Sequence, residues 1–228
     1  MSRTKIEHFG NFSLSVVIPT LNAAATLPGC LASIQPGAPL IREIIVVDGG
    51  SADETLQRTG DAMVINTPAG RGGQLRAGIA AASGDFLLLL HADTCLSPNW
   101  PEAVAAANPD IAGYFHFRLD SPLWLARMIE RIVALRCRIL SLPYGDQGLL
   151  ISRTLLMQIG GMPDLPLMED VALAHRLKGR LRSLPATATT SAAKYERDGW
   201  LRRPFRNLLC LTLYFAGVPP EKIRKLYG

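Results

Sequence analysis

The sequence predicts an α/β fold: a mostly parallel central sheet flanked by helices, with a helical extension at the carboxyl end. Apolar runs of strand length alternate with helical segments through the first half of the chain. One run, Phe86 to Leu90, is apolar throughout, as expected of a strand buried on both faces. The segment 191–228 is basic and helical in pattern, which predicts the extension.

The first half is expected to contain four strands, at Leu14 to Ile18, Glu43 to Asp48, Ala62 to Ile65 and Phe86 to Leu90. Three helices are expected between them: Asn22 to Ile34 capped by Asn22, one opened by the capping box Ser51 to Glu54, and an alanine-rich helix from Gly70 to Gly84. This order implies right-handed crossovers and parallel strands.

The second half is less regular. Strands are expected at Ile111 to Arg118, Gly148 to Ile151 and Leu181 to Ala186. Helices are expected at Leu123 to Leu140, after Ile151 as far as Gly160-Gly161, and from Met168 to about Lys178. The basic tail has breaks at Pro204 and at Pro219-Pro220. With no obvious linker, residues 1–228 are expected to form one domain, with a nucleotide-binding half (1–95), an acceptor and catalytic half (96–190) and a helical tail (191–228).

Composition excludes several classes of protein. Of 228 residues, 48% are apolar, which indicates a globular chain. The 24 basic residues exceed the 19 acidic ones only modestly, and no basic patch is interleaved with aromatic residues, so we expect no nucleic-acid partner. The four cysteines form no C-x-x-C pair, which argues against a structural zinc site and favours reduced thiols in the cytoplasm. Met1 to Asn11 is too polar for a signal peptide, and no apolar run is long enough to span a bilayer.

Polar residues follow the first two predicted strands. The segments Pro19 to Asn22 and Asp48 to Ser51 are expected side by side at the carboxyl edge of the sheet, where an acidic residue can accept hydrogen bonds from a base or a ribose. The alternative is that Asn22 and Ser51 only cap helices and Asp48 only closes a turn. Taken singly, each residue favours that alternative.

The buried run Phe86 to Leu90 ends in His91-Ala92-Asp93. An imidazole and a carboxylate two residues apart at a strand end can hold a divalent cation, which would serve a phosphate-bearing substrate. Alone, His91 would be a structural histidine and Asp93 a helix cap, but their shared position favours the metal site.

Three further polar clusters interrupt apolar segments. Gly70 to Gln74 lacks the last glycine of the dinucleotide fingerprint, so we expect no Rossmann cofactor site, although Arg71 could still meet an anion. Glu169-Asp170 could simply be acids that interact favourably with the dipole at the N-terminus of a helix. The preceding Gly160 to Pro163 suggests a shaped loop, however, and this favours a site. Asp146-Gln147 is the third cluster.

Four motifs in order resemble those of family 2 glycosyltransferases. They are Ser15 to Asn22 (SVVIPTLN), Val46 to Asp53 (VVDGGSAD), His91-Ala92-Asp93 as an Asp-x-Asp-like motif, and Met168-Glu169-Asp170. The resemblance covers residues 14 to 190. Gly70 to Gln74 and Tyr144 to Gly148 further resemble a bacterial subgroup labelled radical-SAM/selenodomain-associated transferase 2.

The resemblance implies a GT-A fold that binds a nucleotide-diphospho-sugar donor with Mn²⁺ or Mg²⁺. The residues it assigns to the nucleotide-sugar site are Pro19, Thr20, Asn22, Asp48, Gly50, Arg71 and Ala92. Asp93, with His91, would hold the metal against the diphosphate. Asp170 would be the general base that deprotonates the acceptor hydroxyl, supported by Glu169, and one direct displacement would invert the anomeric centre.

The chain departs from the family pattern twice. His91 replaces the first aspartate of Asp-x-Asp, which suits Mn²⁺ better than Mg²⁺. Thr189 to Lys194 contains no histidine where many relatives place a third ligand. Acceptor recognition is assigned to Asp146, Gln147 and the segment Tyr195 to Arg206, which includes Trp200, and the acceptor itself is not identified.

The helix Leu123 to Leu140 and the tail Trp200 to Tyr214 both combine arginines with apolar or aromatic faces. Such helices can lie on an anionic membrane and present a lipid-linked acceptor. The alternatives are ordinary packed helices with solvated arginines, which the periodicity fits equally well, or a homo-oligomer interface. We expect the protein to be cytoplasmic; the alternative is that it also contacts the inner face of the membrane peripherally.

Two other functions stay open at this point. A sugar-phosphate nucleotidyltransferase shares the sheet and the metal–phosphate chemistry, but Thr20 to Thr26 lacks its glycine-rich basic loop. A catalytically decayed nucleotide-sugar-binding or scaffold protein is kept open by His91 and opposed by the intact Glu169-Asp170.

Overall fold

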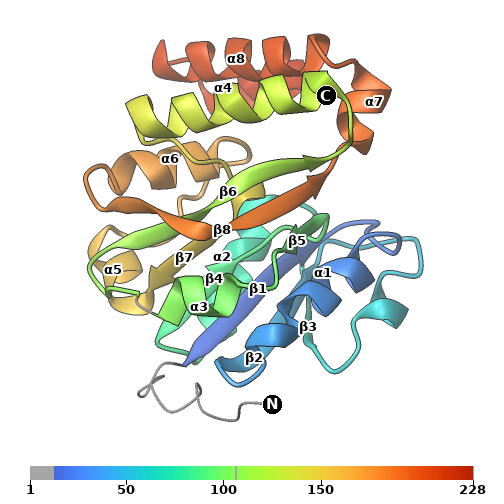
Figure 1. The fold of residues 1–228 in the computed structure, drawn as a ribbon, viewed down its shortest axis with the longest axis vertical. Coiled ribbons are helices and arrows are strands. Elements are labelled where there is room, and N and C mark those ends of the chain that lie inside the picture. The colour runs from blue at the N-terminus through green and yellow to red at the C-terminus, as the bar shows by residue number, and fades with distance from the viewer. Residues whose placement is uncertain (1–12, 106, 228) are drawn as a thin grey trace.

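The computed structural model describes residues 13–105 and 107–227, which build an eight-stranded sheet covered by helices on both faces (Figure 1). Its strands are, in chain order, Leu14–Thr20 (β1), Ile41–Asp48 (β2), Met63–Asn66 (β3), Phe86–Leu89 (β4), Thr94–Leu96 (β5), Ala112–Asp120 (β6), Leu149–Ser152 (β7) and Leu181–Ser191 (β8). Its α-helices are Leu27–Ile34 (α1), Arg71–Ala81 (α2), Trp100–Ala105 (α3), Trp124–Leu140 (α4), Arg153–Gln158 (α5), Glu169–Arg176 (α6), Ala193–Asp198 (α7), Arg202–Phe215 (α8) and Pro220–Tyr227 (α9). Short 3₁₀ turns lie at Gln35–Gly37 (η1), Leu56–Arg58 (η2) and Gly145–Gln147 (η3).

The strand order is β3-β2-β1-β4-β7-β6-β8-β5. Among these described strands only β5 and β7 run against the rest, so the predicted α/β fold with a mostly parallel sheet is confirmed. Because β1, β2 and β4 are parallel and adjacent, the segments that follow them meet at one edge. In the register of β1 and β2, Thr20 lies opposite Asp48.

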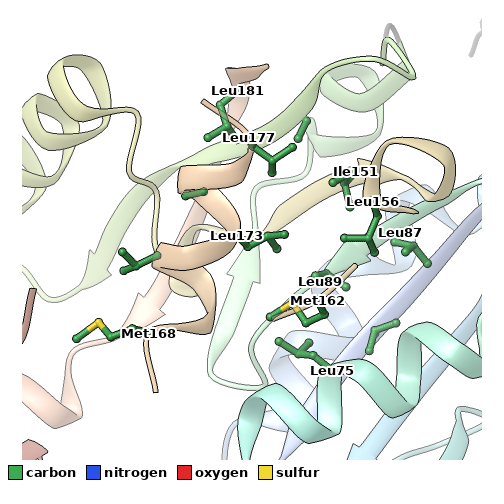
Figure 2. Packing of buried hydrophobic residues seen from close by; sticks show 14 of the residues in the cluster. Leu75, Leu87, Leu89, Ile151, Leu156, Met162, Met168, Leu173, Leu177 and Leu181 are labelled. Carbon is green, nitrogen blue, oxygen red and sulfur yellow. The ribbon is translucent and has the colours of Figure 1, made fainter. Parts of the chain in front are cut away.

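The two faces of the sheet carry different helices, as the alternation of side chains along a strand requires. On one face, Val16 and Leu88 pack with residues of α1 and α3. On the other, Val17 and Leu87 pack with residues of α2, α5 and α6. Figure 2 shows this second cluster, in which leucines of α2, β4, α5 and α6 point toward one another. It fixes α6, and with it Glu169 and Asp170, relative to α2 and β4.

Two predicted helix starts are wrong. The first helix begins at Leu27 and not after Asn22, because Asn22 has a left-handed backbone (φ 50°) and its side-chain oxygen accepts a hydrogen bond from Ala52 N at 2.8 Å. The box Ser51 to Glu54 opens only the short turn η2. The Ser51 hydroxyl cannot cap a helix there, since it donates to Asp48 at 2.5 Å and accepts from Asn22 N at 2.8 Å.

Other differences lie at strand and helix ends. Strand β1 continues through Pro19 to Thr20, and the three-residue strand β5, which the sequence analysis missed, pairs Thr94 with Thr190 of β8. Pro204 does not break α8, because it lies in the first helical turn, where its missing N–H has no partner to lose. Met1 to Phe12, including the segment judged too polar for a signal peptide, lie outside the described residues.

Candidate functional site

Two neighbouring cavities open at the carboxyl edge of the sheet. The strand-end cavity, of about 600 Å³, is lined by segments that follow β1 and β4 and by the start of α2. The arginine cavity, of about 320 Å³, lies between the ends of β4 and β8, η3, α6 and α8. Six residues line both cavities: Arg71, His91, Asp93, Ser191, Lys194 and Arg197.

Of the residues assigned to the nucleotide-sugar site, five line the strand-end cavity: Pro19, Thr20, Asn22, Arg71 and Ala92. Asp48 and Gly50 are not among the residues that line it. Asp48 is buried, and its carboxylate accepts hydrogen bonds from Thr20 Oγ1 (3.0 Å), Gly50 N (2.9 Å) and Ser51 N (2.8 Å). Burial alone would raise the pKa of Asp48, but the hydrogen bonds from Ser51, Thr20 and Gly50 outweigh it and hold the pKa below its usual value. Asp48 thus shapes the loop that borders the cavity.

Gln74 also lines the strand-end cavity, and sequence reasoning gave it no role. Its side-chain amide donates to the carbonyl oxygens of Thr20 (2.7 Å) and Val47 (2.8 Å), so it joins α2 to the ends of β1 and β2. Its place three residues after Arg71 in the motif Gly70 to Gln74 was the available signal.

Arg71 contacts three predicted site residues at once. Its guanidinium forms ion pairs with Glu169 and with Asp170 (Nη2 to Oδ2, 3.2 Å), and Nη1 lies 3.4 Å from His91 Nε2. Glu169 is buried, and burial raises its pKa although Arg71 opposes the shift. Glu169 lines neither cavity, so its contact with the site is through Arg71.

Asp170 lines the arginine cavity and is held by backbone donors. Its Oδ2 accepts from Gly145 N at 3.0 Å and its Oδ1 from Val171 N at 2.8 Å. Burial would raise its pKa, but Arg71 and these two N–H groups hold the pKa below its usual value. Gly145 cannot be replaced without a shift, because a Cβ there would lie 2.5 Å from His91 Nε2.

His91 and Asp93, the predicted metal ligands, both line the two cavities. Burial, and then the charge of Arg71, lower the pKa of His91 to about 4, so its imidazole is neutral at pH 7. Asp93 Oδ2 accepts a bond from Lys194 Nζ at 2.8 Å. Burial raises the pKa of Asp93, but Lys194 and His91 outweigh it and lower the pKa. In the described part of the chain no cluster of three His, Cys, Asp or Glu side chains is placed to hold a metal.

The predicted acceptor residues separate. Asp146 lines the arginine cavity, and its Oδ1 is buried with no hydrogen-bond partner. Burial, partly opposed by Arg136, raises the pKa of Asp146 to about 6. Gln147 is buried away from both cavities, where it bonds Phe115 O (3.1 Å) and Arg136 (3.3 Å). Trp200 lines neither cavity either; it stacks on Tyr195, a residue of the cavity wall, with ring centroids 5.7 Å apart.

The outer wall of the arginine cavity carries the positive charge after which we name it. Arg197, Arg203 and Arg206 all contact the carboxylate of Asp198, at 2.7, 2.8 and 3.0 Å. Three guanidinium groups around one carboxylate leave a net positive charge beside Lys194 and Arg71. All three lie in or beside the segment Tyr195 to Arg206, which sequence analysis left without individual roles.

Residues 15–110 match the model of the family "Glycosyl transferase family 2". A PGL/p-HBAD biosynthesis glycosyltransferase of Mycobacterium bovis is 40% identical over 91 residues, which is 36% of this chain and 36% of the relative. The chain therefore matches about a third of the length of that relative.

Two solved structures share the fold. Glucosyl-3-phosphoglycerate synthase from Mycobacterium tuberculosis, in complex with Mn²⁺, UDP-glucose and glycerol 3-phosphate, has a TM-score of 0.57 and 22% identity, covering 81% of this chain and 72% of that one. TarS 1–349 of S. aureus has a TM-score of 0.63 and 16% identity, covering 94% and 69%. The likeness to these solved structures confirms the predicted GT-A fold. The family match covers residues 15–110, so the family of the whole chain and its subgroup stay predictions.

Proposed function

We propose, from the match of residues 15–110 to the model of glycosyl transferase family 2, that this chain is an inverting glycosyltransferase. It moves a sugar from a nucleotide-diphospho-sugar to an acceptor hydroxyl. The observation that carries the proposal is the position of Asp170: its carboxylate lines the arginine cavity beside His91 and Asp93, which also line the strand-end cavity. This position would let Asp170 act as the base where the two proposed substrates meet.

The strand-end cavity is the proposed donor site. Its wall of Pro19, Thr20, Asn22 and Ala92 would contact the nucleoside, and the Asp48–Gly50 loop would border it. Arg71 and Lys194, at the wall shared by both cavities, would contact the diphosphate. The donor in the M. tuberculosis structure is UDP-glucose; the base and sugar of this chain's donor are not specified by that likeness.

His91 and Asp93 are suitable ligands for Mn²⁺ or Mg²⁺. The neutral imidazole and the ionised carboxylate each offer an unprotonated ligand atom, and cations that bind phosphates commonly take only one or two protein ligands. Lys194 would turn from Asp93 toward the diphosphate, which its half-exposed side chain permits. When bound, the cation would supply positive charge to the leaving diphosphate.

The chemistry at Asp170 follows from its contacts. Asp170 accepts the proton of the acceptor hydroxyl as that oxygen bonds to the anomeric carbon, and the bond from this carbon to the diphosphate oxygen breaks. The diphosphate leaves with the electron pair, and Arg71 and Lys194 face its added charge. Because the nucleophile enters opposite the leaving group, the anomeric configuration inverts. Glu169 keeps Arg71 in place.

The arginine cavity is the proposed acceptor site. Asp146, with its raised pKa and unpartnered oxygen, can donate a hydrogen bond to a second hydroxyl of the acceptor when protonated, or accept one from it when ionised. The positive wall of Arg203 and Arg206 favours an acceptor that carries an anionic group. Gln147 and Trp200 would act on this site only through the neighbouring Tyr144 and Tyr195.

The test is Asp170→Asn, which keeps the size of the side chain and removes the base. Transfer should fall by about 10²- to 10⁴-fold, while donor affinity measured by calorimetry stays within about threefold. Asp61→Asn, an exposed change away from both cavities, is the matched control and should leave transfer unchanged. Donor binding without turnover in the wild type would instead indicate a nucleotide-sugar-binding protein.

A further inference from the structure

Helix α8 has two unlike faces, and its apolar face points outward. Leu201, at its N-cap, and Phe205 are each 68% exposed and Leu208 is 60% exposed, and Phe215 continues the same stripe along the helix. The opposite side faces the protein: Arg203 and Asn207 line the arginine cavity, the Oδ1 of Asn207 is buried without a partner, and farther along the helix Cys210 packs in the core. A helix at the water-exposed surface of a globular protein normally turns its polar residues outward.

Helix α4 repeats this pattern. Its inner side, with Ala126, Ile129 and Val133, packs on β6, whereas Trp124 (70% exposed) and Ile139 (67% exposed) face outward. The exposed residues Ile132 and Leu135 lie on the same side as Trp124 and Ile139. The exposed Arg131 and Arg138 flank this stripe on one side.

The two helices lie at one end of the molecule, beyond β6 and β8 (Figure 1). Their carboxyl-terminal ends border one shallow hollow of about 470 Å³, lined by Leu140 and Leu142 from α4 and the residues after it and by Leu211 and Phe215 from α8. Lys178 lies at the same hollow. We call the outer faces of α4 and α8 with this hollow the α4–α8 face. Exposed apolar groups gathered in this way mark an interaction site.

Charge decides between the two obvious occupants. The exposed arginines of helices α4 and α8 are Arg131, Arg138 and Arg202. The two helices contain one acidic residue, Glu130, and it is paired with Arg127. In a twofold dimer the same face meets itself, so arginines would meet arginines. An anionic bilayer offers both an apolar interior for Phe205 and Trp124 and negative headgroups for Arg131 and Arg138.

We propose that the α4–α8 face binds the surface of an anionic lipid bilayer, with the apolar stripes inserted at the headgroup boundary and the arginines against the headgroups. None of the helices in the described part of the chain is long and apolar enough to cross a membrane, so the contact is peripheral. The inner side of α8 would then place Arg203 and the arginine cavity about one helix diameter, roughly 10 Å, from the lipid surface.

Sedimentation with vesicles tests this directly. The full chain should bind vesicles of phosphatidylcholine mixed with phosphatidylglycerol, and bind pure phosphatidylcholine much more weakly. The double variant Phe205→Gln, Leu208→Gln should lose about a hundredfold in partition coefficient. Both side chains are exposed, so the variant should fold, which circular dichroism can verify.

A second variant isolates the charge. Arg131→Gln with Arg138→Gln should lower the partition coefficient on the anionic vesicles by about fivefold for each arginine, and should not change binding to neutral ones. Met157→Gln on α5, also an exposed apolar residue, is the matched control and should bind as the wild type does.

Two results would overturn the proposal. One is vesicle binding that is absent in the wild type or unchanged in the α8 double variant. The other is a wild-type dimer in light scattering that the α8 double variant converts to a monomer, because the face would then be covered by a second copy of the chain. Neither result depends on transferase activity, so the proposed function is tested separately.

Discussion

At the scale of single residues, several carboxylates of the site are already paired with a cationic side chain before any substrate is present. Arg71 contacts Glu169 and Asp170, and Lys194 contacts Asp93. Asp146 differs from these acids, because its Oδ1 is buried with no hydrogen-bond partner. Because of this difference, we expect the ionisation of Asp146 to change the free energy of unfolding as the pH changes.

We expect Asp146→Asn to stabilise the protein at high pH and not at low pH. The pKa of Asp146 rises from an ordinary 3.8 to about 6 in the folded state, so between these values the folded chain holds a proton that the unfolded chain has released. The free energy of unfolding of the wild type therefore falls as the pH rises through this window, by up to roughly 3 kcal/mol. Urea titrations of both proteins at pH 4 and pH 8 measure the difference.

The control for this prediction is Asp110→Asn, since Asp110 is exposed. It should shift stability equally at the two pH values. If Asp146→Asn also gave the same shift at pH 4 and pH 8, the carboxyl of Asp146 would not be ionising in a buried setting.

At the scale of elements, α2 is the helix on which the strand-end cavity, the proposed donor site, depends, because Arg71 and Gln74 lie in its first turns. It packs closely on the sheet through Gly78. A Cβ at Gly78 would lie 2.4 Å from Val17 Cγ1 and 2.9 Å from Val47 Cγ2, so no larger residue fits without moving the helix. The packing of Gly78 on the sheet thus fixes the position of Arg71, which lies about 10 Å away along the helix axis at a rise of about 1.5 Å per residue.

Gly78→Ala should therefore destabilise the protein by about 1–3 kcal/mol, although alanine is the better helix former. Gly73→Ala, in the same helix, is the matched control: its Cβ would meet only Arg76, at 3.9 Å, so it should be neutral or stabilise by up to about 1 kcal/mol. Thermal unfolding of the two variants compares them. A neutral Gly78→Ala would mean that α2 is free to shift on the sheet.

The elements also show what the sequence could and could not predict. Periodicity and breakers predict the strands β1, β2 and β4 and the long helix α4, because local pattern and burial agree there. The start of α1 was misplaced because Asn22 and Ser51 bond each other's loops across 29 residues, which no local pattern shows. Strand β5 was missed for the same reason: its three residues are a strand only because β8 lies beside them.

The candidate site divides in a similar way. Residues at strand ends, such as Asp93 and Thr20, could be predicted to meet because parallel strands end at one edge. The sequence does not distinguish Asp48 and Gln147 from residues that line a cavity, yet their polar atoms are hydrogen-bonded to the protein's own backbone or side chains. Lys194 could not be linked to Asp93 from the sequence, because 101 residues separate them.

At the scale of the whole molecule, the carboxyl-terminal helices belong to the main core. Cys210 and Leu211 of α8 and Ile223 of α9 pack in the same cluster as Val17 and Leu87 of the sheet. The tail 191–228, predicted as a separate segment of one domain, should therefore unfold together with the sheet. That single-domain organisation stays a prediction, and it can be tested at Ile223.

Ile223→Ala should lower the free energy of unfolding by about 2–4 kcal/mol, because Ile223 is fully buried. Calorimetry should still show one transition, at a lower temperature. Leu226→Ala, in the same helix but 58% exposed, should stay within about 0.5 kcal/mol of the wild type. A separate low-temperature transition in Ile223→Ala would show instead that α8 and α9 melt on their own.

The two cavities share a wall, and this has a consequence for inhibitor design. Arg71, His91, Asp93 and Lys194 border both spaces, so a compound that fills the strand-end cavity already touches the boundary of the other. A bisubstrate molecule needs only a short connector across that boundary, and the binding of its first half holds the second half at an effective concentration in the millimolar range. Such a compound should bind far more tightly than either half, and the length of the best connector would measure the separation of the proposed donor and acceptor sites.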